Sequence, residues 1–273
     1  MSAAAAPVRL AVLGDPLLFT RSPELHRAGL QVLGLAGDSE ARRTPAATLP
    51  AELRGLARAG FRGASLTHPL KEPALLAVDR ASADARAARS INTVGFDRDG
   101  IWGESTDGPG FLDLLESLGV APARVVLLGA GGAARSLALA LARGPAPRVV
   151  VAARRPADAA AVWGAIPGAT LVEWRSAAES QALGQADLVV HCTPLAGAYP
   201  PPAPLEAIAP EAAVIDLVYG ADPTPWVLAA RASGRRAWDG LGLLVFQARR
   251  ALGLWFGREV PVEPLARAVG WPR

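Results

Sequence analysis

Two residue types that could do chemistry occur only once in this chain of 273 residues. Lys71 is the only lysine and Asn92 is the only asparagine. The chain fills its other basic positions with arginine. A lone lysine therefore indicates a position whose function a guanidinium group cannot perform. A lysine amine can exchange a proton in a suitable environment, whereas guanidinium effectively cannot. Lys71 is therefore a candidate acid–base group, although a lysine at this kind of position is commonly a solvated surface residue.

Hydroxyl, amide and carboxylate side chains occur at three further places, each at the end of a predicted strand or turn or at the start of a predicted helix. Thr20 and Ser22 precede Pro23 and an acidic residue, which predicts a helix start with Ser22 as the N-cap. The amide groups of such a start can also bind a carboxylate, although most such starts are only caps. Asn92 and Asp107 lie where strands or turns end, and sites collect there in α/β proteins.

A glycine turn at residues 129–134, with the sequence GAGGAA, lies between an apolar strand and an apolar helix. A strand, a glycine turn and a helix in this order are typical of a dinucleotide-binding site. Gly129 would permit the tight turn, Gly131 would let the backbone approach a pyrophosphate, and Ala134 stands where a third glycine is usual. Without these flanks the run would be read as a plain turn. We therefore predict cofactor contacts from the turn residues, which are Gly129, Ala130, Gly131, Gly132 and Ala133.

The end of the next strand indicates which dinucleotide binds. NAD-binding proteins usually carry an acidic residue there, which accepts hydrogen bonds from the ribose. This chain carries Arg154 and Arg155 instead. Two guanidinium groups suit a 2′-phosphate, so the sequence predicts NADP, with a solvated basic turn as the alternative.

The elements that must position these residues form two groups. Up to about residue 105, strands at 8–14 and 61–67 alternate with helices, and a hairpin follows around Asp99-Gly100. One of these helices is predicted to begin at Pro69, to carry Lys71 and to run towards Val78. From 106 to 240, strands alternate with helices as in a doubly wound parallel sheet. Strands are predicted in this second part at 124–128, 148–153, 188–191 and 214–217.

The fold class is therefore α/β, with an N-terminal α/β substrate domain (residues 1–105) and a doubly wound, Rossmann-type NADP-binding domain (residues 106–240). A helix at 241–256 is predicted, and residues 241–273 are expected to pack back onto the first domain.

Composition argues against several classes of protein. The net charge is +3 and no basic cluster is present, so we expect no nucleic-acid binding. Cys192 is the only cysteine, which fits a reducing compartment. The first residues lack the charged region of a signal peptide, and no apolar run reaches 18 residues, so we expect a cytoplasmic protein without a membrane span. His26, His68 and His191 lack metal-ligand spacing, so no metal is expected.

Nine segments, in the same order and along nearly the whole chain, resemble the motifs of the shikimate dehydrogenase family. The matching segments are residues 14–26 (GDP with TxSPxxH), 65–72 (SLTHPLKE), 90–93 (SINT), 105–108 (STDG), 129–135 (GAGGAAR), 153–155 (ARR), 191–194 (HCTP), 216–219 (DLVY) and 239–248 (DGLGLLVFQA). No single segment is diagnostic of the family, but nine segments in the same order are strong evidence of the resemblance.

The resemblance implies the reversible reduction of 3-dehydroshikimate, a small anionic hydroaromatic acid, to shikimate by NADPH. Lys71 would exchange the proton, and Asp107 would hydrogen-bond the reacting hydroxyl and orient the amine. The implied substrate contacts are Thr20 and Ser22 for the carboxylate, Thr67, Asn92 and Gln247 for the hydroxyls, and Tyr219. Further implied cofactor contacts are Thr193, Leu217 and Gly240.

Some residues depart from the family pattern. Phe19 replaces a histidine, Thr20 and Ser65 replace a serine and an asparagine, and Ala153 and Asp239 each replace an asparagine. Substrate preference is less secure than the chemistry, so a quinate or amino-shikimate dehydrogenase remains an alternative. A second alternative is an inactive NADP-binding sensor, against which the intact Lys71 and Asp107 argue. The sequence leaves a monomer or a homodimer open.

Overall fold

The chain divides into two compact units. The computed structural model describes residues 6–17, 19–143, 148–194 and 202–273. Unit 1 comprises residues 1–110 and 244–272, and unit 2 comprises residues 111–243 together with Arg273. The sequence pattern predicts the two boundaries after residues 105 and 240. No helix in these ranges is long and apolar enough to cross a membrane.

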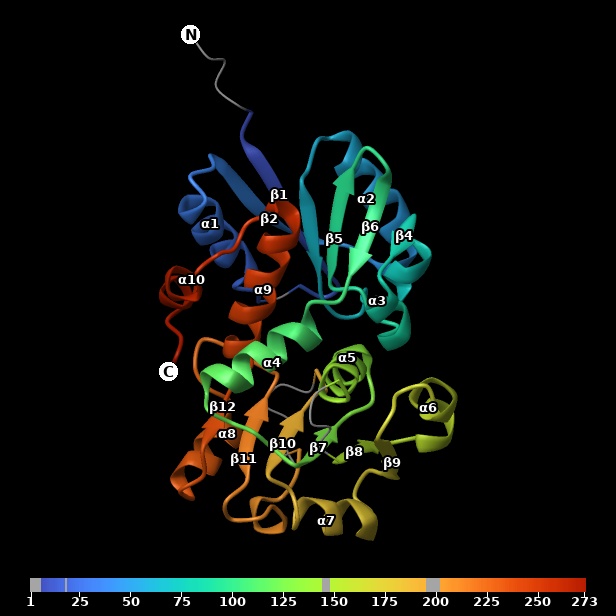
Figure 1. The fold of residues 1–273 in the computed structure, drawn as a ribbon, viewed down its shortest axis with the longest axis vertical. Coiled ribbons are helices and arrows are strands. Elements are labelled where there is room, and N and C mark those ends of the chain that lie inside the picture. Colours follow the sequence, from blue (N-terminus) through green and yellow to red (C-terminus); the bar gives the residue numbers. More distant parts are fainter. Residues whose placement is uncertain (1–5, 18, 144–147, 195–201) are drawn as a thin grey trace. The chain divides into compact units, whose positions relative to one another are not determined.

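Unit 1 contains a mixed sheet whose strands have the order β2-β1-β3-β5-β6-β4. Its strands are β1 Val8–Gly14, β2 Gly37–Arg43, β3 Gly63–Leu66, β4 Arg80–Ala81, β5 Thr93–Asp97 and β6 Gly100–Glu104. Strand β1 is parallel to β2 and β3, whereas β5 is antiparallel to both of its neighbours. The helices are α1 Ser22–Val32, α2 Leu49–Arg58, α3 Ala83–Ala88, most of α9 Leu241–Phe256, and α10 Val262–Val269. Helix α4 Asp107–Ser117 begins in this unit (Figure 1).

Trp255 fixes α9 to the sheet of unit 1. Its indole is fully buried and donates a hydrogen bond to the Val94 carbonyl oxygen at 2.9 Å. A Cβ atom on Gly63 would lie 2.2 Å from the indole nitrogen, so glycine in β3 lets the ring reach the strand backbone. Arg62 adds a hydrogen bond to the Trp255 carbonyl oxygen at 2.6 Å.

Unit 2 contains a parallel sheet with the strand order β12-β11-β10-β7-β8-β9. Its strands are β7 Arg124–Leu128, β8 Arg148–Ala153, β9 Ala169–Glu173, β10 Leu188–His191, β11 Ala213–Asp216 and β12 Ala237–Trp238. The helices are α5 Gly132–Leu141, α6 Pro156–Trp163, α7 Ala177–Leu183 and α8 Pro225–Ala232. The order runs outward in both directions from β7 and β10, which is the doubly wound arrangement predicted from the sequence. Ligands of such sheets bind at this switch point, beyond the carboxyl ends of the strands.

Several predicted elements agree with the structure. The strands at 124–128, 148–153 and 188–191 and the helix at 241–256 have the predicted bounds, and the hairpin consists of β5 and β6. These elements are apolar runs ended by glycine or polar residues, which is where hydrophobic pattern is most informative.

Two local predictions were wrong. No α-helix begins at Pro69: Lys71 lies in consecutive turns, followed by a 3-10 helix at Pro73–Leu76. An α-helix starting at Pro69 would need an N–H group on residue 73, and proline has none. Ser22 is not the N-cap of α1 either, because it is the first helical residue and Arg21 precedes it as the cap, without a side-chain capping bond.

Candidate functional site

Lys71 and Asp107 form a close ion pair in unit 1. The Nζ atom of Lys71 lies 2.6 Å from Oδ2 of Asp107, with 23% of the lysine side chain and 5% of the aspartate side chain exposed. The turn that carries Lys71 is tied to the sheet, because the Ile91 N–H donates to the Lys71 carbonyl oxygen at 2.8 Å. Asp107 is the first residue of α4. The amine is therefore held in place yet keeps access to solvent or a ligand.

Asn92 connects this pair to its surroundings. Its Nδ2 atom lies 2.9 Å from Oδ1 of Asp107, 2.9 Å from Oγ1 of Thr106 and 3.0 Å from Oε1 of Gln247. Its Oδ1 atom accepts the Thr106 N–H at 2.7 Å. An amide offers two donors and one acceptor, and here both ends are engaged within the protein. The two oxygens of Asp107 are thus shared between Lys71 and Asn92, and this fixes the carboxylate plane.

Gln247 reaches the same network from α9, since its Nε2 atom donates to the Leu244 carbonyl oxygen at 3.1 Å while its Oε1 atom faces Asn92. Thr106 also bonds the Thr93 hydroxyl at 3.0 Å. The structure therefore brings together Lys71, Asn92, Asp107 and Gln247, which the sequence flagged separately. It adds Thr93 and Thr106 as buried partners.

Thr20, Ser22 and Thr67 lie after the carboxyl ends of β1 and β3. The Ser22 N–H donates to Oγ1 of Thr20 at 3.2 Å, at the start of α1. Thr67 packs against Gly14, where a Cβ atom would lie 2.5 Å from its methyl group. The Thr67 N–H also bonds the Leu13 carbonyl oxygen at 2.9 Å. The start of the segment after β3 is thus held against the end of β1.

His26 joins α1 to strands β2 and β3 within the core. Its ring is fully buried, with Nδ1 at 2.7 Å from the Ser39 hydroxyl and Nε2 at 3.2 Å from the Ser65 hydroxyl. Burial, with a smaller contribution from the neighbouring Arg27 charge, lowers the pKa of His26 from 6.5 to about 3. His26 is therefore neutral near pH 7. One ring nitrogen donates to one serine and the other accepts from the second.

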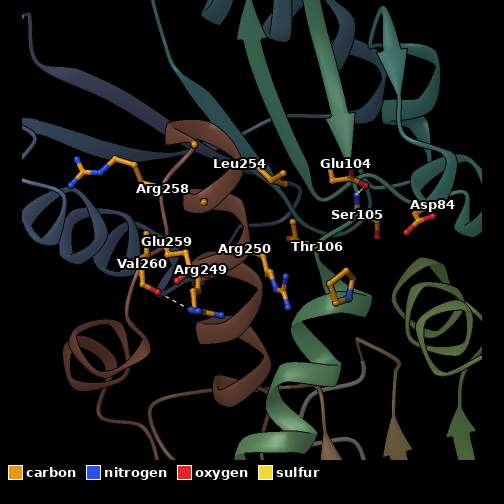
Figure 2. Close-up of a pocket in the computed structure, with 13 residues that line it drawn as sticks. Asp84, Glu104, Ser105, Thr106, Arg249, Arg250, Leu254, Arg258, Glu259 and Val260 are labelled. Atoms are coloured by element: carbon orange, nitrogen blue, oxygen red, sulfur yellow. Dashed lines mark hydrogen bonds between the residues drawn. The ribbon is translucent and has the colours of Figure 1, made fainter. Parts of the chain in front are cut away.

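A pocket of about 450 Å³ in unit 1 shares Thr106 with the network (Figure 2). Helix α9 lines it with Arg250 and Leu254, and the end of β6 lines it with Glu104 and Ser105. Figure 2 shows the guanidinium of Arg250 and the carboxylate of Glu104 on different sides of this space. Its lining carries charged side chains of both signs.

The glycine turn of unit 2 combines a tight turn with open space at the start of α5. Gly129 has a φ of +117°, which favours glycine, and a Cβ atom there would lie 2.7 Å from the Thr193 methyl group. Gly131 is the exposed N-cap of α5 and has no side-chain capping bond. A Cβ atom on Gly131 would meet nothing within 4 Å. The free space and the helix N-terminus leave room for a phosphate at this point.

Arg154 and Arg155 are both exposed directly after β8. Arg155 lies 3.2 Å from Asp158, but 83% and 65% of these two side chains are exposed. Such a surface pair contributes little to stability and is easily exchanged for another anion. Both guanidinium groups are therefore accessible to a ligand phosphate.

The remaining predicted residues of unit 2 follow the strands β10, β11 and β12. Thr193 is hydrogen-bonded to the buried His191, whose Nδ1 atom lies 2.8 Å from Oδ1 of Asp216. Gly240 packs against Leu217, because a Cβ atom on Gly240 would lie 2.0 Å from the Leu217 carbonyl oxygen. Tyr219 follows in the same segment and is half-buried. These positions surround the carboxyl edge of the sheet next to the switch point.

No group of three or more histidine, cysteine, aspartate or glutamate side chains that could hold a metal ion occurs in the described part of the chain. Sequence reasoning did not identify Thr93, the Ser39–His26–Ser65 chain, or Arg273, which pairs with Asp239 at 2.5 Å. Thr93, a polar residue in the otherwise apolar and buried strand β5, was the available signal for the first, whereas Ser39 is the only buried residue of β2 and carried no such signal. Nothing in the sequence marked Arg273.

Comparisons with known proteins agree with this architecture. The model of the shikimate dehydrogenase substrate binding domain matches residues 12–94, and that of the shikimate 5′-dehydrogenase C-terminal domain matches residues 240–269. A shikimate dehydrogenase (NADP(+)) of Methylobacterium radiotolerans is 39% identical over 269 residues, which is 95% of each chain.

Solved structures give the same result. The shikimate 5-dehydrogenase of Thermus thermophilus, in complex with NADP(H) and shikimate, matches with a TM-score of 0.84 and 36% identity over 96% of this chain and 98% of the other. A 5-ketofructose reductase of a Gluconobacter strain matches with a TM-score of 0.83 and 25% identity, over 97% of this chain and 99% of the other. On the identity and coverage of these relatives, this chain belongs to the shikimate dehydrogenase family.

Proposed function

We propose that this chain is an NADP-dependent shikimate dehydrogenase, which catalyses the reversible reduction of 3-dehydroshikimate to shikimate. The observation that carries the proposal is the ion pair between Lys71 and Asp107, held by Asn92. A partly exposed amine that is fixed by a buried carboxylate is a suitable proton donor and acceptor. Unit 1 would bind the substrate and unit 2 the cofactor.

The proton is handled by Lys71. When the ketone is reduced, the ammonium group donates a proton to the oxygen that becomes a hydroxyl. In the reverse direction the neutral amine takes that proton. Asp107 keeps Nζ at one position through Oδ2, and Asn92 prevents the carboxylate from turning. When bound, NADPH would supply the hydride to the carbonyl carbon of the ketone, and NADP⁺ would accept it from that carbon in the reverse direction.

The substrate carboxylate fits the start of α1. The hydroxyls of Thr20 and Ser22 lie there, and the N-terminus of the 11-residue helix adds a positive dipole end. Thr67, Asn92 and Gln247 would contact the ring hydroxyls, and Tyr219 is a further proposed substrate contact. In the structure Asn92 and Gln247 bond each other, so part of their contribution is to orient Asp107.

The residues of unit 2 fit NADP. The open space at Gly131 accommodates a pyrophosphate beside the N-terminus of α5, and the exposed Arg154 and Arg155 suit the 2′-phosphate. The further proposed contacts are Ala130, Gly132, Ala133, Thr193, Leu217 and Gly240. We also propose that the enzyme is cytoplasmic, binds no nucleic acid, and works as a monomer or a homodimer.

A second candidate is a family relative that acts on another polyhydroxylated compound. The match to a 5-ketofructose reductase shows that this fold is compatible with a different carbonyl substrate. The exposed Phe19 and the added methyl group of Thr20 lie in the segment proposed to bind the carboxylate, so they could shift the preference.

Steady-state assays in parallel would test these proposals. The purified chain should reduce NADP⁺ with shikimate much faster than with quinate, and should show weak or no 5-ketofructose reduction with NADPH. A higher kcat/KM for quinate or 5-ketofructose would favour the second candidate. NADP binding without turnover of any of these substrates would instead favour an inactive sensor.

A further inference from the structure

Asp239 is a buried carboxylate two residues before the start of α9. The residue is 2% exposed, and its Oδ1 atom accepts the Leu241 N–H at 3.1 Å. An asparagine could accept the same bond through its own oxygen. The aspartate therefore keeps the contact with α9 but adds a negative charge, which is costly in a buried position without a partner.

Arg273 supplies that partner. Two of its guanidinium nitrogens approach Oδ2 of Asp239, Nη2 at 2.5 Å and Nε at 3.1 Å. The arginine side chain itself is only 19% exposed. Its own main chain is anchored too, because Nη2 of Arg231 donates to the Arg273 carbonyl oxygen at 2.7 Å.

The guanidinium group of Arg273 also binds main-chain carbonyl oxygens of the segment after β11. Its Nη2 atom donates to the Gly220 carbonyl oxygen at 3.0 Å, and its Nη1 atom donates to the Ala221 carbonyl oxygen. These residues belong to the segment after β11, which has no regular secondary structure and carries Tyr219. Arg273 thus joins two stretches of unit 2 that are distant in sequence.

The two stretches also meet directly. The Gly240 N–H donates to the Val218 carbonyl oxygen at 3.1 Å, and Gly240 leaves no room for a Cβ atom beside the Leu217 carbonyl oxygen. A shift of the segment after β11 would therefore move the proposed contacts Leu217, Tyr219 and Gly240 together.

We propose that Arg273 is a positioning residue, which neutralises Asp239 and holds residues 217–221 in place for the substrate and the nicotinamide end of the cofactor. This inference rests on the proposed function for the role of residues 217–221. The two effects of Arg273 differ in their chemistry and can be separated. Charge neutralisation is needed only while residue 239 is an aspartate, whereas the bonds to Gly220 and Ala221 are needed whatever residue 239 is.

The experiment compares the wild type with Arg273→Ala, Asp239→Asn and the double variant. Arg148→Ala, an exposed arginine at the start of β8, is the matched control. The melting temperature without ligands, the KM values for shikimate and NADP⁺, and the Kd of NADP⁺ from direct titration are measured for each protein.

Arg273→Ala should lower the melting temperature by roughly 5–15 °C, because it leaves a buried carboxylate unpaired. It should also raise the KM for shikimate roughly fivefold to tenfold, as expected for lost charge-assisted bonds to the segment. Adding Asp239→Asn should restore most of the melting temperature but leave the raised KM. Asp239→Asn alone should change both quantities little, and Arg148→Ala should match the wild type.

A double variant whose KM returns to the Asp239→Asn value would overturn the positioning role, because Arg273 would then only neutralise a charge. A melting temperature that the second substitution does not restore would overturn the neutralising role. If the wild type did not turn over shikimate, the proposed function would fail separately. The melting temperatures would still decide the neutralising role, and the positioning role would be decided by the Kd of NADP⁺, which Arg273→Ala should raise both alone and together with Asp239→Asn.

Discussion

At the scale of single residues, the network around Asp107 holds the amine of Lys71 in one position for proton transfer. Lys71 and Asn92 each take one oxygen of the carboxylate, so neither the amine nor the carboxylate can rotate without losing a bond. Catalysis by proton transfer depends on such geometry, because the reacting groups must be within hydrogen-bond reach.

Replacing Lys71 with arginine is the most direct test of that role. We expect kcat to fall roughly 10²–10⁴-fold, with little change in the KM for shikimate, because guanidinium keeps the charge but cannot give up its proton. Lys71→Ala should be about equally impaired. The Kd of NADP⁺, measured in the same preparations, should stay at the wild-type value and show that the fold is intact. Near-full activity of the arginine variant would mean that Lys71 makes only an electrostatic contact.

Arg154 and Arg155 offer a second test at this scale. The double replacement by alanine should weaken NADP⁺ binding by about 2–4 kcal/mol, from charge-assisted hydrogen bonds that are not fully additive. NAD⁺ binding should barely change, because NAD⁺ lacks the 2′-phosphate. Titrations of both cofactors, with Arg148→Ala as the control, would measure the difference. Equal losses for the two cofactors would refute the proposed phosphate contact.

At the scale of elements, His26 joins three of them in unit 1. It lies on α1 and bonds Ser39 of β2 and Ser65 of β3. The pKa of His26 is about 3 in the folded protein because the ring is buried, against 6.5 for an exposed histidine. Protonation therefore favours the unfolded state. This contribution to stability is complete above about pH 6.5 and is lost as the pH falls towards 3.

The expected consequence is a pH-dependent free energy of unfolding. Below pH 6.5 His26 should contribute a slope of up to about 1.4 kcal/mol per pH unit. His26→Gln should remove that slope between pH 6.5 and 5, as measured by chemical denaturation at several pH values. His68→Gln, at an exposed position, should keep the wild-type slope. A His26→Gln slope equal to the wild type would show that protons are taken up elsewhere.

The glycine turn before α5 allows a prediction that separates folding from binding. Gly131→Ala should leave the melting temperature nearly unchanged, because the new Cβ atom meets nothing within 4 Å and the backbone has φ −79°, which alanine adopts. It should weaken NADP⁺ binding roughly tenfold or more, since the methyl group would occupy the space of the pyrophosphate. Gly55→Ala in α2, also in open space, is the control and should leave NADP⁺ binding unaffected. Unchanged binding by Gly131→Ala would place the pyrophosphate elsewhere.

At the scale of the whole molecule, the sequence predicted the doubly wound sheet of unit 2 better than the mixed sheet of unit 1. Strands β7, β8 and β10 are buried and apolar, so hydrophobic pattern identifies them. Strand β2 has the sequence GDSEARR at the edge of its sheet and only one fully buried residue, so no such pattern exists. The parallel pairing with β1 that makes it a strand is a tertiary contact.

The candidate site was predictable as a set of residues but not as a network. The lone Lys71 and Asn92 were visible in the composition, and the family motifs indicated Asp107 and Gln247. Their mutual bonds depend on how β5, α4 and α9 meet, which no local pattern encodes. The pairing of Asp239 with Arg273 was unpredictable for the same reason, because 34 residues separate the two.

The single lysine has a practical consequence for chemical modification. Besides the α-amino group, Lys71 carries the only primary amine among the 28 lysines and arginines. An acylating reagent should therefore abolish activity after one adduct at Lys71, detected by mass spectrometry, and shikimate with NADP⁺ should slow that adduct. Full acylation at Lys71 with activity retained would contradict the proposed role. Amine coupling to a biosensor surface would likewise attach a part of the molecules through the proposed active site and the rest through the α-amino group, so immobilisation should use another chemistry.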